Sequence, residues 1–169
     1  GGTGKTPTTL KLYQLLKAKK YNTVIGKKYY SNQKDEQILL ENKASLITSR
    51  NREKIIKLAI KLDHELIIFD DGLQERRFDY DIKFVCFDSK SWIGNGFLIP
   101  SGPLREKIQS LTKHDGVFLK SSIKNFNSSE IYSKIKNINP KIEIFNSYVF
   151  IKNINQFSLS DNFIIFSGI

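Results

Sequence analysis

The first seven residues of the chain have the types and spacing of a phosphate-binding loop. They read Gly-Gly-Thr-Gly-Lys-Thr-Pro, which is most of the pattern G-x-x-x-x-G-K-[ST] without its leading glycine. Glycine lets the backbone approach a phosphate and turn through positive φ, so that backbone N–H groups can bind the anion. In such a loop the lysine reaches the β- and γ-phosphates and the threonine hydroxyl ligates Mg²⁺. The residues predicted to bind a nucleotide are Gly1, Gly2, Thr3, Gly4, Lys5, Thr6 and Pro7.

An acidic pair, Asp70-Asp71, follows the most apolar strand that the sequence predicts. In α/β sheets ligands gather at the carboxyl ends of strands, and a carboxylate there beside a phosphate loop holds Mg²⁺ directly or through water. By itself an Asp-Asp-Gly sequence is equally typical of an acidic turn. Combined with the phosphate loop, it predicts metal ligation by Asp70 and Asp71 together with Thr6.

Two further stretches carry polar residues, and their sequence pattern alone does not distinguish a role in substrate binding from a structural role. Residues 94–106 form a connection rich in glycine and proline that can line a substrate pocket, and its Arg105 can pair with a phosphate in a forked geometry. A turn followed by a capped helix explains the same residues. The acidic pair Asp35-Glu36 is, from its spacing, an ordinary helix start.

Short apolar segments alternate with helical patterns along the chain. The helices predicted from periodicity and capping cover residues 6–20, 35–42, 52–62 and 127–137. The predicted strands cover residues 23–25, 45–48, 65–69, 82–87, 116–119, 142–145 and 163–166, and residues 146–161 are compatible with a hairpin. Several strands are continuously apolar, which indicates burial on both faces. The sequence therefore predicts one α/β domain over residues 1–169, a P-loop NTPase-like, mostly parallel sheet flanked by helices.

Composition excludes several other classes of protein. The net charge is +10, from 27 Lys and Arg against 17 Asp and Glu, but the lysines are scattered and no basic block interleaves with aromatic residues, so no nucleic-acid partner is predicted. One cysteine, Cys86, excludes a disulfide framework, and its apolar surroundings predict a small buried side chain. The two histidines have no metal-ligand spacing, and no Ser-His-Asp set can be assembled. No run of 18 apolar residues is present.

Six short motifs occur along the chain in a definite order. They are Gly-Gly-Thr-Gly-Lys-Thr-Pro at 1–7, Asp-Glu at 35–36, Asp-Asp-Gly-Leu-Gln at 70–74, Gly-Asn-Gly at 94–96, Gly-Pro-Leu-Arg-Glu at 102–106 and Phe-Ser-Gly-Ile at 166–169. In this order they resemble the tetraacyldisaccharide 4'-kinase family, the lipid A 4'-kinases of Gram-negative bacteria. The resemblance covers the whole chain. It implies that the chain corresponds to about the first half of such a protein, with a membrane-anchoring helix before Gly1 and a second domain after Ile169.

The resemblance also implies an activity. This is ATP- and Mg²⁺-dependent phosphoryl transfer to the 4'-hydroxyl of a tetraacyldisaccharide 1-phosphate, the lipid A disaccharide precursor, at the cytoplasmic face of the bacterial inner membrane. The basic surface would suit an anionic membrane. By resemblance Asp35 is the base toward the sugar hydroxyl, and the catalytic set is Asp35, Lys5 and Asp71. Glu36 joins the metal ligands Thr6, Asp70 and Asp71. Substrate contacts fall on Asn95, Arg105 and Glu106, and an arginine that follows the third strand falls on Arg52.

The chain departs from the family pattern in two places besides the missing first glycine. The family has an Arg-Gly-Tyr stretch after the second strand, whereas residues 26–30 read Gly-Lys-Lys-Tyr-Tyr, so no substrate contact is expected there. A downstream histidine that partners the catalytic aspartate lies outside the 169 residues, which predicts that these residues alone are nearly inactive. Two other hypotheses stay open: a phosphate-loop ATPase of the partitioning or metal-insertion type, and a non-catalytic basic module that binds nucleic acid. The Gly-Pro-Leu-Arg-Glu stretch argues against the first, and Mg·ATP binding lost in Lys5→Ala would argue against the second. The sequence does not indicate an oligomeric state.

Overall fold

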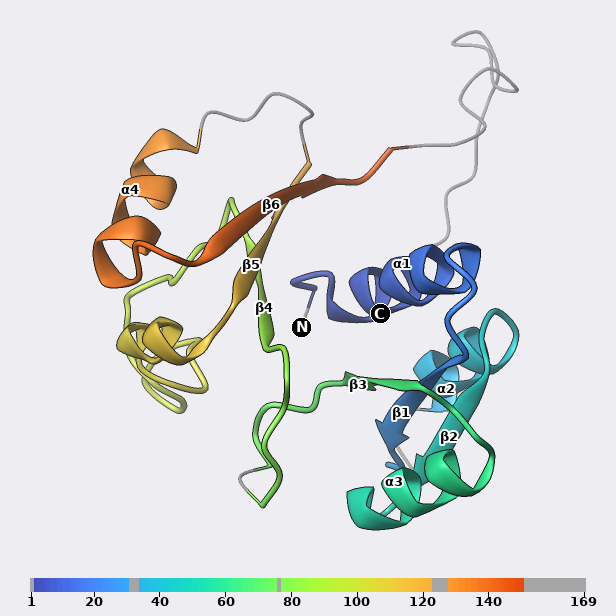
Figure 1. Cartoon of the computed structure of the whole chain (residues 1–169). Helices are drawn as coiled ribbons and strands as arrows, with labels where there is room; N and C mark the ends of the chain where they lie inside the picture. Colours follow the sequence, from blue (N-terminus) through green and yellow to red (C-terminus); the bar gives the residue numbers. More distant parts are fainter. Residues whose placement is uncertain (1, 31–33, 76, 123–127, 151–169) are drawn as a thin grey trace, which may run out of the picture.

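The computed structural model describes residues 2–30, 34–75, 77–122 and 128–150, which form two parallel three-stranded sheets with helices packed on them (Figure 1). The first sheet has the order β2-β1-β3, with β1 at Thr23–Lys28, β2 at Leu46–Ser49 and β3 at Leu66–Asp70. The second has the order β4-β5-β6, with β4 at Phe84–Asp88, β5 at Gly116–Ser121 and β6 at Glu143–Tyr148. All four strand pairings are parallel, so within each sheet the carboxyl ends of the strands meet at one edge.

Helices alternate with the strands of the first sheet. They are α1 (Lys5–Ala18), α2 (Lys34–Glu41) and α3 (Arg52–Lys61). The second sheet is accompanied by a 3₁₀ helix, η1 (Ile108–Lys113), and by α4 (Ser129–Ile138). Within the described residues, no helix combines the length and the apolar composition that crossing a bilayer requires.

Strand β1 is the centre of the first sheet and is buried on both faces. Consecutive side chains of a strand point to opposite sides. Val24 packs against Ile55 of α3, whereas Ile25 packs against Tyr13 of α1 and Leu40 of α2. Helices therefore cover both faces of this sheet, which explains why its central strand is continuously apolar in sequence.

The second sheet has two different faces. On one, Leu111 of η1 and Ile135 of α4 pack against Val117 of β5. The other face carries one phenylalanine from each strand, Phe84, Phe118 and Phe145, with adjacent ring centroids 5.3 and 5.1 Å apart. Residues 116–119 alternate between these faces, and both faces are apolar.

The predicted helices and strands of the described residues are confirmed, with boundaries that differ by at most three residues. The hairpin considered for residues 146–161 is wrong at its start, because residues 146–148 continue β6 along β5, and residues 151–161 lie outside the described residues. The capping box that the sequence predicts at residues 127–130 begins at Asn127, which lies outside the described residues, and in the structure the N-cap of α4 is Ser128, whose side chain makes no capping hydrogen bond. The predicted strand at 163–166 lies outside the described residues.

Candidate active site

The glycine loop at the start of the chain leads directly into α1. Gly2 and Gly4 have φ values of 86° and 85°, in the left-handed region that glycine adopts without steric cost. Gly4 is the N-cap of α1, and the first turn of that helix contains no acidic residue. The positive end of the helix dipole is therefore not compensated by an acidic side chain of its own first turn, which favours an anion at this position. The predicted loop residue Gly1 lies outside the described residues.

Asp70 ends β3 and receives three donors from two other elements. Its carboxylate accepts hydrogen bonds from the hydroxyls of Thr6 (3.1 Å) and Thr9 (3.4 Å) on α1. Lys27 of β1 lies opposite Asp70 in the parallel register, and its Nζ is 2.7 Å from the carboxylate. Asp70 is 2% exposed and Lys27 is 5% exposed. A buried charge needs a partner of this kind, so the pair fixes the position of the carboxylate.

Asp71 is held through both its backbone and its side chain. Its φ is 58°, a left-handed conformation that costs a residue with a side chain roughly 1–2 kcal/mol. Its carbonyl oxygen accepts a 2.6 Å hydrogen bond from the Arg52 guanidinium. Its carboxylate, one-third exposed, accepts from Arg105 Nη1 at 2.9 and 3.0 Å and lies 3.8 Å from Lys5 Nζ. The phosphate-loop lysine and the acidic pair thus lie together, as the sequence predicts.

The residues around α1 and β3 suit a magnesium ion. Thr6, Asp70 and Asp71 offer hydroxyl and carboxylate oxygens, the hard donors that Mg²⁺ prefers. In the described part of the chain, no group of three or more His, Cys, Asp or Glu residues could hold a metal by itself. The two carboxylates and the hydroxyl named above fit the usual coordination of Mg²⁺ by one or two carboxylates, water and substrate phosphates.

The predicted base is not joined to this cluster by a contact. Asp35 is exposed in the first turn of α2, and Glu36 follows it in the same helix. Within the described residues, no hydrogen bond or ion pair connects Asp35 with Lys5 or Asp71. Its role in catalysis stays a prediction.

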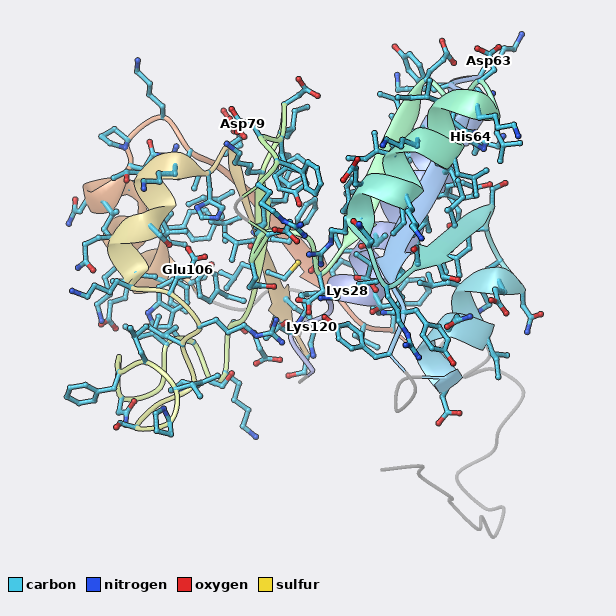
Figure 2. The ribbon with its side chains drawn as sticks, turned by 90° about the horizontal axis from the view of Figure 1, so that it is seen from below. Lys28, Asp63, His64, Asp79, Glu106 and Lys120 are labelled. Carbon is cyan, nitrogen blue, oxygen red and sulfur yellow. The ribbon has the colours of Figure 1, made fainter. Side chains whose placement is uncertain are left out.

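The three predicted substrate residues of the loop between β4 and η1 have different surroundings. Arg105 reaches the Asp71 carboxylate. Asn95 holds the loop itself, because its amide donates to the carbonyl of Ser101 at 2.8 Å and accepts from the backbone N–H of Phe97 at 3.1 Å. Glu106 is exposed, and Figure 2 shows it in the half of the molecule that contains β4, β5 and β6.

The same loop carries an exposed apolar surface. Phe97 is 63% and Ile99 is 62% exposed. A hollow of about 550 Å³ lies along residues 96–101 and 107–109. Exposed apolar side chains beside a hollow are typical of binding surfaces.

Several residues of the site were not predicted from the sequence. Lys27 and Thr9 both donate hydrogen bonds to the Asp70 carboxylate. Of these two, Lys27 could have been noticed in the sequence, because a charged residue is unusual in a strand that is otherwise buried. A third unpredicted residue, Lys120 of β5, forms an ion pair with Asp88 at the end of β4. A hydrogen bond from Lys120 holds the pKa of Asp88 below its ordinary value, and backbone N–H groups add to this effect.

Cys86 differs slightly from its prediction. It is partly buried, whereas the sequence predicts a buried side chain. Burial raises the pKa of its thiol, while a hydrogen bond with Thr8 and the charge of Lys5 act in the opposite direction. The net rise favours the protonated thiol, so the structure gives Cys86 no nucleophilic role.

Comparisons with protein families and with individual sequences gave consistent matches. The family model described as LpxK, Tetraacyldisaccharide-1-P 4'-kinase, matches residues 1–169. The tetraacyldisaccharide 4'-kinase of Pelagibacter ubique (strain HTCC1062) is 40% identical over 169 residues, which covers 100% of this chain and 53% of that protein. The protein of the same name from Rickettsia rickettsii (strain Sheila Smith) is 39% identical over 139 residues, covering 72% of this chain and 43% of the relative. The chain spans about half the length of these relatives.

A solved structure supports the fold. The hydrogenase maturation factor HypB from Archaeoglobus fulgidus superposes with a TM-score of 0.59, covering 87% of this chain and 76% of that one. The sequence identity is 12%, so the likeness shows the fold alone. It agrees with the predicted α/β architecture of parallel sheets flanked by helices.

Proposed function

The chain belongs to the tetraacyldisaccharide-1-P 4'-kinase family, and on this premise we propose that it is the nucleotide-binding part of an ATP-dependent lipid kinase. The reaction is transfer of the γ-phosphoryl group to the 4'-hydroxyl of a tetraacyldisaccharide 1-phosphate, the lipid A disaccharide precursor. The observation that carries the proposal is the contact between Thr6 and Asp70, 64 positions apart, beside the approach of Lys5 to Asp71. These contacts unite a phosphate loop with an acidic pair at the carboxyl end of a parallel strand.

In this proposal, different residues around the phosphate loop bind the phosphates of ATP and the metal ion. Backbone N–H groups of the loop and the ammonium of Lys5 bind the phosphates. The Thr6 hydroxyl donates its hydrogen bond to Asp70, which leaves the lone pairs of the hydroxyl oxygen free to face a cation. Thr6 and Asp71 would hold Mg²⁺, with Glu36 added by the family resemblance, and the ion would supply positive charge beside the phosphates.

Arg105 has a role that follows from its present partner. Its guanidinium pairs with the Asp71 carboxylate, which is the metal ligand in this proposal. If that carboxylate held a cation, Arg105 would lose this partner, and its guanidinium could then pair with a phosphate group in the forked geometry that arginine favours. Arg105 thus balances the charge of Asp71 before the donor binds.

The acceptor side of the proposal rests on α2 and on the loop after β4. Asp35 is exposed, so its carboxylate can accept a proton from a sugar hydroxyl. Phe97 and Ile99 provide an apolar surface for acyl chains, and the net charge of +10 suits the anionic cytoplasmic face of the inner membrane. A well-placed Lys or Arg contributes about 1 kcal/mol to such membrane binding.

The alternative ATPase hypothesis has less support. The likeness to a hydrogenase maturation factor is at 12% identity and concerns the fold, whereas the match to the kinase family model spans residues 1–169. No observation favours a nucleic-acid-binding module.

The test is a phosphorylation assay on the full-length protein with Mg·ATP and tetraacyldisaccharide 1-phosphate. We expect 4'-phosphorylated product, and a fall in kcat of roughly 10²–10⁴-fold in Asp35→Asn with ATP binding retained. Asp81→Asn, a change of another exposed aspartate, is the matched control and should leave kcat unchanged. Absence of product from the unchanged protein would contradict the proposed reaction, and full turnover in Asp35→Asn would contradict the role of Asp35 alone.

A further inference from the structure

Lys120, at the carboxyl end of β5, contacts the phosphate loop from the second sheet. Its Nζ donates a 2.5 Å hydrogen bond to the carbonyl oxygen of Gly2, 118 positions away. Its aliphatic stem lies against Gly4, where an added Cβ would stand 3.2 Å from Lys120 Cδ. Figure 2 shows Lys120 where the two halves of the molecule meet. Lys120 is therefore a direct link between the β4–β5–β6 sheet and the loop.

Asp88 fixes the position of Lys120. The two residues lie opposite each other in the parallel register of β4 and β5, and the Lys120 Nζ to Asp88 Oδ2 distance is 3.0 Å. Asp88 Oδ1 in turn accepts from the backbone N–H groups of Lys90 (2.9 Å) and Ser91 (3.4 Å). The side chains of the pair are only 25% and 24% exposed. Both carboxylate oxygens of Asp88 are thus engaged, one by backbone N–H groups and the other by the Lys120 ammonium that contacts the loop.

A phosphate loop needs support of this kind. It binds its anion with N–H groups, so some of its carbonyl groups must turn away from the ligand and find other donors. Its glycines are also the residues that lose most conformational freedom when they are ordered. We propose that Lys120 is a positioning residue that holds the phosphate loop in its anion-binding conformation, and that Asp88 holds Lys120. This inference rests on the proposed function, because the anion is the triphosphate of ATP.

Two physical roles for Lys120 make opposite predictions for Asp88. If the ammonium acted by attracting the phosphates, Asp88→Asn would remove a competing negative charge and ATP would bind more tightly. If Lys120 acts by position, Asp88→Asn loosens the lysine and ATP binds more weakly. The structure favours position, since the contacts of Nζ are a carbonyl oxygen and a carboxylate.

The experiment compares three variants of the full-length protein by kcat, by KM for ATP and by melting temperature without nucleotide. Lys120→Met keeps the aliphatic stem and removes the ammonium that donates to the Gly2 carbonyl. We expect KM for ATP to rise about tenfold, because the loop loses a charge-assisted hydrogen bond. We expect kcat to change less than about threefold, because the loop binds ATP equally in the ground state and in the transition state. Asp88→Asn should raise KM by a smaller factor. Lys83→Met removes a lysine of similar exposure (28%) that pairs with Asp79, and it should leave KM unchanged.

The outcomes separate this inference from the proposed function. Binding of Mg·ATP by the unchanged protein is measured first, and its absence would overturn the proposed function and this inference with it. If the unchanged protein binds Mg·ATP but Lys120→Met has the KM of Lys83→Met, the inference is wrong. It is also wrong if Asp88→Asn lowers KM, or if Lys120→Met lowers the melting temperature while KM stays constant.

Discussion

The buried ion pair between Lys27 and Asp70 gives the sharpest prediction for the first sheet. The substitution Lys27→Met keeps the length and the apolar stem of the side chain and removes its charge. Among the described residues, Asp70, which is 2% exposed, then keeps the hydroxyls of Thr6 and Thr9 as its side-chain donors. Removing one partner of a buried pair typically costs about 3–5 kcal/mol, because the other charge stays buried without compensation.

The measurable effect is a large fall in thermal stability. For a domain of this size 1 kcal/mol corresponds to roughly 2–4 °C in melting temperature, so we expect Lys27→Met to melt about 6–20 °C lower. The double variant Lys27→Met/Asp70→Asn should recover part of this loss, since it removes the uncompensated charge. The assay is thermal unfolding followed by circular dichroism at pH 7.

The matched control is a surface pair in α3. Lys57 Nζ lies 2.6 Å from Glu53 Oε1, a distance close to the 2.7 Å of the buried pair, but these side chains are 72% and 50% exposed. Such a pair contributes about 0.3–0.5 kcal/mol, so Lys57→Met should lower the melting temperature by about 2 °C or less. Equal shifts for Lys27→Met and Lys57→Met would refute the reasoning from burial.

Three further predictions concern the loop, the metal and acid. Gly4→Ala should weaken Mg·ATP binding in calorimetry more than Gly2→Ala, because both positions have positive φ but only Gly4 has a side chain within 4 Å of the added methyl. Arg105→Gln should lower the Mg²⁺ concentration for half-maximal activity, because it frees the Asp71 carboxylate, and it should lower kcat, because it removes a partner of the phosphate. An unchanged Mg²⁺ dependence would contradict the proposal that Arg105 and the metal compete for Asp71. The pKa of Asp88 is lower in the folded protein than its unfolded value of 3.8, so this carboxylate stabilises the folded state at pH values above 3.8. That stabilisation is lost as the pH falls through the lower pKa of the folded state. Asp88→Asn should therefore flatten the decline of melting temperature below about pH 4.

The phosphate loop and the acidic pair could be predicted because local rules place them. A glycine-rich loop before a helix and a carboxylate after a buried parallel strand both have positions fixed by their own element, and parallel strands bring their carboxyl ends together. Thr6 and Asp70 accordingly meet as expected. The order of helices and strands followed from periodicity for the same local reason.

The supporting residues could not be predicted because they depend on register between strands. Lys27 meets Asp70 only through the alignment of β1 with β3, and Lys120 meets Asp88 only through the alignment of β5 with β4. Strand patterns also do not say which strands pair, so the separation into two three-stranded sheets was not foreseen. The amide of Asn95 is engaged in its own loop, a tertiary detail without a sequence signal.

A crystal structure of the full-length protein with Mg²⁺ and a non-hydrolysable ATP analogue tests the central claim most directly. The account predicts the terminal phosphate in contact with Lys5 Nζ, and the metal bound by the Thr6 hydroxyl and by an Asp71 carboxylate that has released Arg105. A triphosphate bound elsewhere, or a metal that contacts neither Thr6 nor Asp71, would contradict it.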